Sequence, residues 1–256
     1  MRKEKVRYFK SFTDDFEATA NENFKLREDY KWVRTDLPYK VLSGIIYGLA
    51  IIFGGLYCYL FLHMRVRGRK NLKKIKGGYF IYANHTQPIG DVFIPALAVL
   101  PKRIYTVVST ANYGIPVIGK ILPFLGALPI TESLHGIKEL NKAIDFRIKK
   151  GHPIVIYPEA HVWEYYTDIR PFPDSSLKFP IKLESPSLCM TVTYKKSKIF
   201  KRPLMEVFLD GPFYGEGNTV KEKTADLHKK VYDTMKKRSL NSNYSYIEYV
   251  SAKEKP

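Results

Sequence analysis

The chain has 256 residues, a formal net charge of +17 and a pI of about 9.6. This length allows one α/β domain with a sizeable core and an appendage, and the charge predicts an anionic partner, either nucleic acid or anionic lipid. The two cysteines, Cys58 and Cys189, are too few for a disulfide framework and fit a reducing compartment. Residues 1–40 lack an apolar h-region, so we expect no signal peptide.

Residues 1–38 are polar and aromatic. Phe9, Phe12 and Phe16 fall at helical spacing, which is compatible with an amphipathic helix on a membrane surface. A flexible arm and a helix packed on the main domain fit the same pattern. We therefore treat this segment as an N-terminal appendage.

The segment from Val41 to Met64 contains no Asp, Glu, Lys or Arg. As a helix, its 24 residues would be roughly 36 Å long, which is enough to cross a hydrocarbon core of about 30 Å. Four glycines leave room for a kink or a re-entrant hairpin. The sequence therefore predicts a membrane anchor over residues 39–64, either a spanning helix or a re-entrant hairpin.

Seven of the next twelve residues, Arg65 to Lys76, are Lys or Arg, and none is acidic. By the positive-inside rule, this flank and the domain after it lie on the cytoplasmic face of the cell membrane. A solvated basic linker is the alternative. Because the charge is concentrated beside the apolar run, membrane lipid is favoured over nucleic acid as the anionic partner.

From residue 77 onward, apolar runs typical of strands alternate with helical patterns. A helix is expected to begin at Asp91 as its N-cap, and residues 115–125 form either a short helix or a packed loop. The predicted strands are Tyr79–Ala83, Ile104–Val108, Leu128–Ile130, Pro153–Tyr157, Leu188–Tyr194 and Leu204–Leu209, and the longer helices are His135–Lys150 and Thr224–Arg238. This order predicts an α/β domain over residues 65–256, with a mixed, largely parallel sheet flanked by helices and a site at the carboxyl ends of its strands.

Two of these strand ends carry residues suited to catalysis. His85 and Asp91 follow the first strand, and Glu159 and His161 follow the strand that begins at Pro153. A neutral histidine beside a carboxylate is a general base at neutral pH, although on spacing alone His85 fits a turn cap equally well.

Three blocks at these positions resemble the glycerophospholipid acyltransferase family, whose best-known members are the 1-acylglycerol-3-phosphate acyltransferases. Asn84-His85 with Asp91 matches the N-H-x-x-x-x-D block of that family, the stretch 126–130 looks like its second block, and Tyr157-Pro158-Glu159 resembles its F-P-E-G-T block. Order and spacing agree over roughly residues 65 to 215. The resemblance implies an α/β acyltransferase.

The chain departs from the family pattern in each block. Five residues separate His85 from Asp91 instead of four, and Glu132 stands where the second block has an arginine. Ala160 and His161 replace the glycine and threonine of the third block. These changes indicate a divergent member whose acceptor can differ from the family norm.

The resemblance implies a role for each candidate residue. His85 would be the general base and Asp91 the residue that orients it. Glu159 would organise the acceptor pocket, unless it is a structural turn carboxylate. The remaining substrate contacts are assigned to Asn84, Gly126 and His161, and to Arg170, Lys195 and Lys196 as alternative cations for the acceptor phosphate in place of the missing arginine; each cation fits a solvated surface charge as well.

The activity implied is transfer of a fatty acyl chain from a thioester or acyl phosphate to the hydroxyl of a lysophospholipid, most simply 1-acylglycerol-3-phosphate giving phosphatidate. Acyl carrier protein or coenzyme A would carry the acyl group as co-substrate, with no resident cofactor or metal. Two alternatives stay open. One is a membrane-bound lipid-binding protein without turnover, and the other is a metal-dependent lipid hydrolase that uses His85, Asp91, Glu159 and His161 as ligands.

Overall fold

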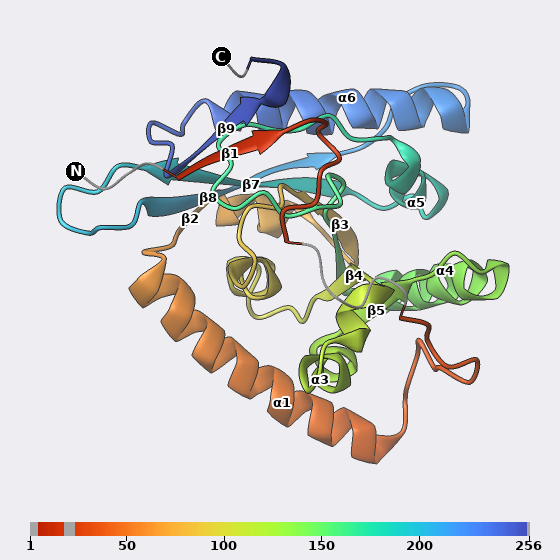
Figure 1. Cartoon of the computed structure of the whole chain (residues 1–256). Helices are drawn as coiled ribbons and strands as arrows, with labels where there is room; N and C mark the ends of the chain where they lie inside the picture. Colours follow the sequence, from red (N-terminus) through yellow and green to blue (C-terminus); the bar gives the residue numbers. More distant parts are fainter. Residues whose placement is uncertain (1–4, 18–23, 255–256) are drawn as a thin grey trace.

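The computed structural model describes residues 5–17 and 24–254. This part of the chain forms a seven-stranded sheet with helices on both faces and a separate two-stranded sheet (Figure 1). The strands are β1 Lys5–Phe9, β2 Arg65–Arg67, β3 Tyr79–Ala83, β4 Tyr105–Ser109, β5 Ala127–Ile130, β6 Pro153–Ile156, β7 Ser187–Lys195, β8 Leu204–Phe213 and β9 Ile247–Ser251. The α-helices are α1 Leu37–Leu56, α2 Ile94–Ala98, α3 Ile118–Leu125, α4 Leu134–Lys149, α5 Lys178–Lys182 and α6 Val220–Ser239.

The large sheet is mixed and largely parallel, as the sequence predicts. Its strand order is β2-β8-β7-β3-β6-β4-β5, and each neighbouring pair is parallel except β7 with β8. β3 lies near the centre of the sheet, between β6 and β7. The first sequence block begins where the chain leaves β3, so this block lies beside two other strands.

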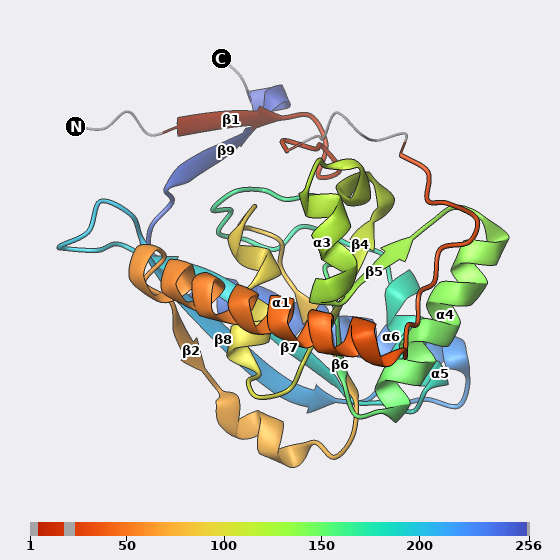
Figure 2. The same ribbon diagram turned by 90° about the horizontal axis from the view of Figure 1, so that it is seen from below.

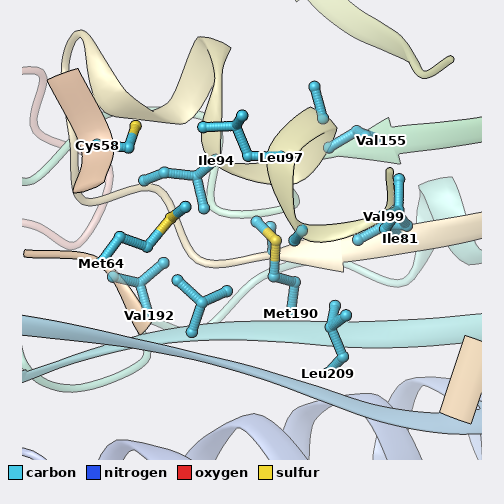
Figure 3. Packing of buried hydrophobic residues seen from close by; sticks show 14 of the residues in the cluster. Cys58, Met64, Ile81, Ile94, Leu97, Val99, Val155, Met190, Val192 and Leu209 are labelled. Atoms are coloured by element: carbon cyan, nitrogen blue, oxygen red, sulfur yellow. The ribbon is translucent and has the colours of Figure 1, made fainter. Parts of the chain in front are cut away.

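Alternation along β3 builds two cores, one on each face of the sheet. Tyr79, Ile81 and Ala83 belong to the core under α2, whereas Phe80 and Tyr82 belong to the core under α4 and α6. Figure 3 shows the first core, in which side chains of α2 pack over apolar side chains of the sheet. Full burial of β3 on both faces is what the continuous apolar run of a central parallel strand predicts.

Helix α1 is the apolar segment predicted as a membrane anchor. Its start is capped by the Asp36 carboxylate, which accepts a 3.1 Å hydrogen bond from the Tyr39 N–H. A π-helical turn over Tyr57–Phe61 extends it to 25 continuous residues, and an 18-residue stretch of them has a mean hydropathy of 2.0, so the helix is long and apolar enough to cross a membrane. Because the helix is continuous, the re-entrant hairpin alternative is wrong.

One face of α1 packs along the α/β domain (Figure 2). The hydroxyls of Tyr39 and Ser43 donate 2.7 Å hydrogen bonds to the carbonyls of Pro123 and Phe124 at the end of α3. Further along, a Cβ on Gly54 would lie 2.4 Å from the Phe93 ring, so only glycine allows this approach. The opposite face presents an exposed apolar stripe: Leu37, Val41, Leu42, Ile45, Leu49, Ile52, Phe53 and Leu56.

Over residues 5–17 the N-terminal appendage is a strand followed by turns, so neither the amphipathic helix nor the packed helix that the phenylalanine spacing allowed is present there. β1 pairs in parallel with β9 near the other end of the chain. Phe9, Phe12 and Phe16 all contact Trp163, with ring centroids 4.9, 6.1 and 5.2 Å away. The apolar spacing reflects packing around one buried indole rather than one face of a helix.

Candidate active site

The candidate site lies where β3 and β6 end side by side. Asn84, the residue after β3, exchanges two hydrogen bonds with the backbone of Val192 in β7: its Nδ2 donates at 3.0 Å and its Oδ1 accepts at 2.8 Å. Both ends of this buried amide are therefore engaged. The structure uses Asn84 to fix the exit of the chain from the sheet and does not present it to a substrate.

His85 and Asp91 form a close pair. The Nδ1 of His85 is 2.7 Å from the Oδ2 of Asp91, and the same oxygen accepts a 2.9 Å hydrogen bond from the Gln87 N–H. The Asp91 side chain is buried, whereas that of His85 is 20% exposed. With Nδ1 directed at Asp91, the Nε2 of His85 is the ring nitrogen left for a substrate hydroxyl.

Asp91 is not the helix cap that the sequence predicts. It lies inside a 3-10 turn, Gly90–Val92, and α2 begins only at Ile94. Its backbone N–H donates to the Gln87 carbonyl at 3.0 Å, which closes the loop after His85. The extra residue between His85 and Asp91 is thus absorbed in a tight turn, and the carboxylate still reaches the imidazole.

Two tyrosines fix this loop by hydrogen bonds, and neither role was predicted from the sequence. The hydroxyl of Tyr194 lies 2.7 Å from the Thr86 Oγ1 and accepts a 2.9 Å bond from the Gln87 Nε2. The ring of Tyr157 stacks on His85 at a centroid distance of 4.2 Å. Its hydroxyl donates a 2.7 Å bond to the Asp91 carbonyl. The sequence offered one signal for the role of Tyr157, which is a tyrosine where the F-P-E-G-T block of the family has phenylalanine.

Glu159 lies behind His85 and holds backbone groups. Its carboxylate accepts hydrogen bonds from the N–H groups of His85 at 3.0 Å and Arg170 at 2.8 Å, and an Arg170 Nη2 lies 3.3 Å away. Burial raises the pKa of this carboxyl, and the Arg170 guanidinium and the two N–H donors oppose the rise. This geometry favours a structural role for Glu159, because both carboxylate oxygens are already bound by donors of the protein.

Arg170 does not serve as the predicted cation for the acceptor phosphate, because it is 1% exposed. Its guanidinium pairs with Glu159, donates to the carbonyls of Phe12 and His161, and lies over the Trp163 ring. A charge enclosed in this way is compensated inside the protein and is not available to a ligand.

Two of the other predicted substrate contacts are paired with carboxylates of the protein. His161 Nδ1 is 3.1 Å from an Asp15 oxygen, and the Lys195 ammonium is 2.7 Å from a carboxylate oxygen of Glu206. Gly126 has a φ of +90° and ends α3, at the amino end of β5 and so at the sheet edge opposite His85. Lys196 is exposed on the connection that follows β7.

The ligand set required by the hydrolase alternative does not converge. Glu159 faces backbone N–H groups and Arg170, and His161 faces Asp15. Within residues 5–17 and 24–254, no three side chains of His, Cys, Asp or Glu come together as a metal site. The arrangement that remains is a partly exposed imidazole against a buried carboxylate, at the carboxyl edge of an α/β sheet, which suits a general-base enzyme.

The comparisons with known proteins agree with this class. The model of the Acyltransferase family matches residues 63–224, so the chain belongs to the Acyltransferase family. A search of curated proteins finds no match. Among solved structures, the crystal structure of the 1-acyl-sn-glycerophosphate acyltransferase PlsC from Thermotoga maritima is similar, with 16% identity, a TM-score of 0.55, and coverage of 84% of this chain and 86% of that chain. At this identity the likeness shows a shared fold, and the family resemblance read from the three blocks is confirmed.

Proposed function

We propose that the protein transfers a fatty acyl chain from a thioester, or from an acyl phosphate, to the free hydroxyl of a lysophospholipid, with His85 as the general base. The most direct acceptor is 1-acylglycerol-3-phosphate, which gives phosphatidate. The observation that carries this proposal is the 2.7 Å contact between His85 and Asp91 in a chain of the Acyltransferase family.

The proposed reaction needs one base and its orienting acid. The Nε2 of His85 takes the proton of the acceptor hydroxyl as that oxygen bonds to the thioester carbonyl carbon. The carbon–sulfur bond then breaks, and the imidazolium gives the proton to the leaving thiolate. Asp91 fixes the ring and stabilises the imidazolium, and a positioned base of this kind contributes about 10²–10⁴ in rate. Acyl carrier protein or coenzyme A would supply the thioester, and no resident cofactor is needed.

The packing of α1 supports a lipid acceptor. The end of this apolar helix lies on the loop that carries Asp91, with Gly54 against Phe93 and Leu62 against Gly90. Ile89, on the same loop, is an exposed apolar side chain. A membrane in contact with the outer stripe of α1 would therefore lie next to the proposed base. In this proposal the domain sits on the cytoplasmic face of the cell membrane, as the basic segment after α1 indicates.

The test is acyl transfer by detergent-solubilised protein, with labelled acyl thioesters and a panel of lysophospholipids. We expect His85→Ala to lower the rate by about 10²–10⁴. Asp91→Asn should lower it strongly at an unchanged melting temperature, because the amide oxygen can still accept the Gln87 N–H. The matched control is His161→Ala, which removes a histidine of the third block that does not face His85. Absence of transfer to every acceptor, or full activity of the His85 variant, would overturn the proposal.

One observation favours a second candidate, a lipid-binding protein without turnover. Glu132 occupies the arginine position of the second block, and it is exposed. That candidate predicts lysophospholipid binding that persists in the His85→Ala variant, with no transfer by either protein. The intact His85–Asp91 pair is the reason to prefer the enzyme.

A further inference from the structure

The connection between β7 and β8 combines positive charge with exposed apolar side chains. We define the hairpin tip as residues 196–202, which contain Lys196, Lys198, Lys201 and Arg202. At its centre, Ile199 is 85% exposed and Phe200 is 46% exposed. Adjacent exposed apolar side chains among four cations at the end of a long hairpin indicate an external partner.

The hairpin tip is held in a fixed shape. The Ser197 Oγ accepts hydrogen bonds from the N–H groups of Ile199 and Phe200, at 3.2 and 2.8 Å. The Phe200 ring stacks on His63 at a centroid distance of 3.6 Å and an interplanar angle of 19°. His63 lies two residues after the helical segment that ends at Phe61, so the hairpin tip is docked beside the end of the apolar helix.

The hairpin tip lies beside the C-terminal end of the helix that carries the exposed stripe. Figure 1 shows the connection between β7 and β8 projecting past the end of α1, on the same side of the domain. Figure 2, viewed from the α1 side, shows the same neighbourhood. Ile199 and Phe200 therefore add exposed apolar side chains near the end of the apolar helix.

The charges of the hairpin tip are largely uncompensated. Lys195, at the end of β7, is paired with Glu206. Within the described residues, Lys196, Lys198, Lys201 and Arg202 have no carboxylate within salt-bridge distance. Cations around exposed apolar side chains match a surface of anionic headgroups over hydrocarbon. An acidic protein would match the charge, but it would not account for the position beside the end of the apolar helix.

We propose that the hairpin tip is a second membrane contact, which binds anionic phospholipid headgroups and places Ile199 and Phe200 in the bilayer. The contact lies far from α1 in sequence and beside its C-terminal end in space. It would hold the domain in one orientation on the membrane, because one helix alone leaves rotation about its axis free.

A single-cysteine dye experiment on the full chain tests the position of the hairpin tip. The native Cys58 and Cys189 are both buried, so an environment-sensitive dye will label an introduced cysteine selectively. Ile199→Cys is the test variant, Leu49→Cys on the α1 stripe reports membrane binding, and Leu134→Cys at the exposed start of α4 is the control in water. With vesicles of phosphatidylcholine and phosphatidylglycerol, the dye at residue 199 should shift to the blue and be quenched by brominated acyl chains.

The dye at residue 134 should not change. A dye at residue 199 that stays in water overturns the proposal, whatever the dye at residue 49 does. The proposal is also overturned if the dye at residue 199 responds to an acidic carrier protein and not to vesicles.

Charge variants test the headgroup preference. Lys198→Gln with Lys201→Gln should weaken binding to the anionic vesicles by about 25-fold, since each lysine near an anionic membrane is worth about a factor of five. The effect should vanish on vesicles of phosphatidylcholine alone. Lys221→Gln with Lys229→Gln, on α6 across the sheet, is the charge-matched control. Equal losses in the two double variants would overturn the proposal.

Discussion

The hydroxyl of Tyr157 donates a 2.7 Å hydrogen bond to the carbonyl of Asp91, while its ring stacks on the imidazole of His85. One side chain at the end of β6 therefore contacts both His85 and Asp91. These two residues lie at the ends of a loop that is one residue longer than the loop of the family's N-H-x-x-x-x-D block. The phenol fixes the far end of that longer loop from outside it. This contact explains how the pair keeps its 2.7 Å separation despite the insertion.

We expect Tyr157→Phe to lower kcat by about tenfold, with little change in the KM for the acceptor. The substitution keeps the stacking ring but leaves the Asp91 carbonyl without its donor, which costs about 1–3 kcal/mol if the carbonyl stays buried. A loop that shifts to avoid this cost would reorient Asp91 relative to His85. An increase of about 1.4 kcal/mol in the barrier lowers the rate about tenfold. Steady-state kinetics with varied acceptor measure both constants.

Tyr82→Phe is the matched control for the Tyr157 variant. The Tyr82 hydroxyl also donates a buried hydrogen bond to a backbone carbonyl, that of Ser176 at 2.9 Å, on the face of the sheet under α6. Both variants should lose similar stability, and only Tyr157→Phe should lose rate. Equal kcat values for the two variants would show that Tyr157 acts through stability alone.

Arg170→Met should destabilise the protein by about 3–5 kcal/mol, because it leaves the Glu159 carboxylate buried without its cation. Glu159→Gln together with Arg170→Met should restore part of that loss, since the neutral amide no longer needs a counter-charge. Urea unfolding of the single variants Arg170→Met and Glu159→Gln and of the double variant measures the coupling between the two residues.

The same variants distinguish the buried ion pair from a phosphate site. If Arg170 bound the acceptor phosphate, the double variant would show a raised KM for the acceptor at a nearly normal melting temperature. We expect the opposite result, in which stability falls and the KM for the acceptor stays close to that of the wild type.

Much of the domain can be predicted because its signals are local. β3 and β6 are continuous apolar runs beside Gly and Pro, and α4 and α6 show helical periodicity, so their positions follow from the chain itself. The pairing of β1 with β9 cannot be predicted in this way. It joins residues more than 200 positions apart, and neither strand has a pattern of its own.

The candidate site could likewise be predicted only where its signals are local in the sequence. The pairing of His85 with Asp91 follows from their block, but the direction in which a carboxylate or guanidinium turns does not. Glu159 and Arg170 look like binding residues in the sequence because both are charged and both follow a strand. Their common burial beneath the turn that contains Phe12 depends on a segment about 150 residues earlier in the chain.

The outer stripe of α1 should control membrane association. Leu49→Asn with Ile52→Asn changes two exposed side chains and leaves the face that contacts α3 intact. We expect weaker flotation with vesicles at an unchanged melting temperature. Leu134→Asn with Leu240→Asn is the control, because these side chains are equally apolar and more exposed but lie on other parts of the domain. Removal of residues 1–64 would be a poorer test, since it uncovers Phe93 of the loop before α2.

Stability should fall in mild acid because of His152, at the start of β6. Burial, and next the charge of Arg147, lower the pKa of this imidazole from its ordinary value of 6.5. At a pH above 6.5 the residue is neutral in both the folded and the unfolded chain, so it contributes no pH dependence. As the pH falls through that value, the unfolded chain takes up a proton first, and the free energy of unfolding decreases until the pH passes below the lowered folded pKa.

His152→Gln should therefore flatten the decline in melting temperature between about pH 7.5 and pH 5.5. The other five histidines remain in both proteins, so the difference between the two curves isolates His152. Because Arg147 contributes through its charge, added salt should reduce that difference in part, whereas the burial contribution should persist. Parallel curves for wild type and variant would mean that His152 has the same proton affinity in the folded and the unfolded chain. That result would contradict the prediction, which rests on the burial of His152 beside Tyr105.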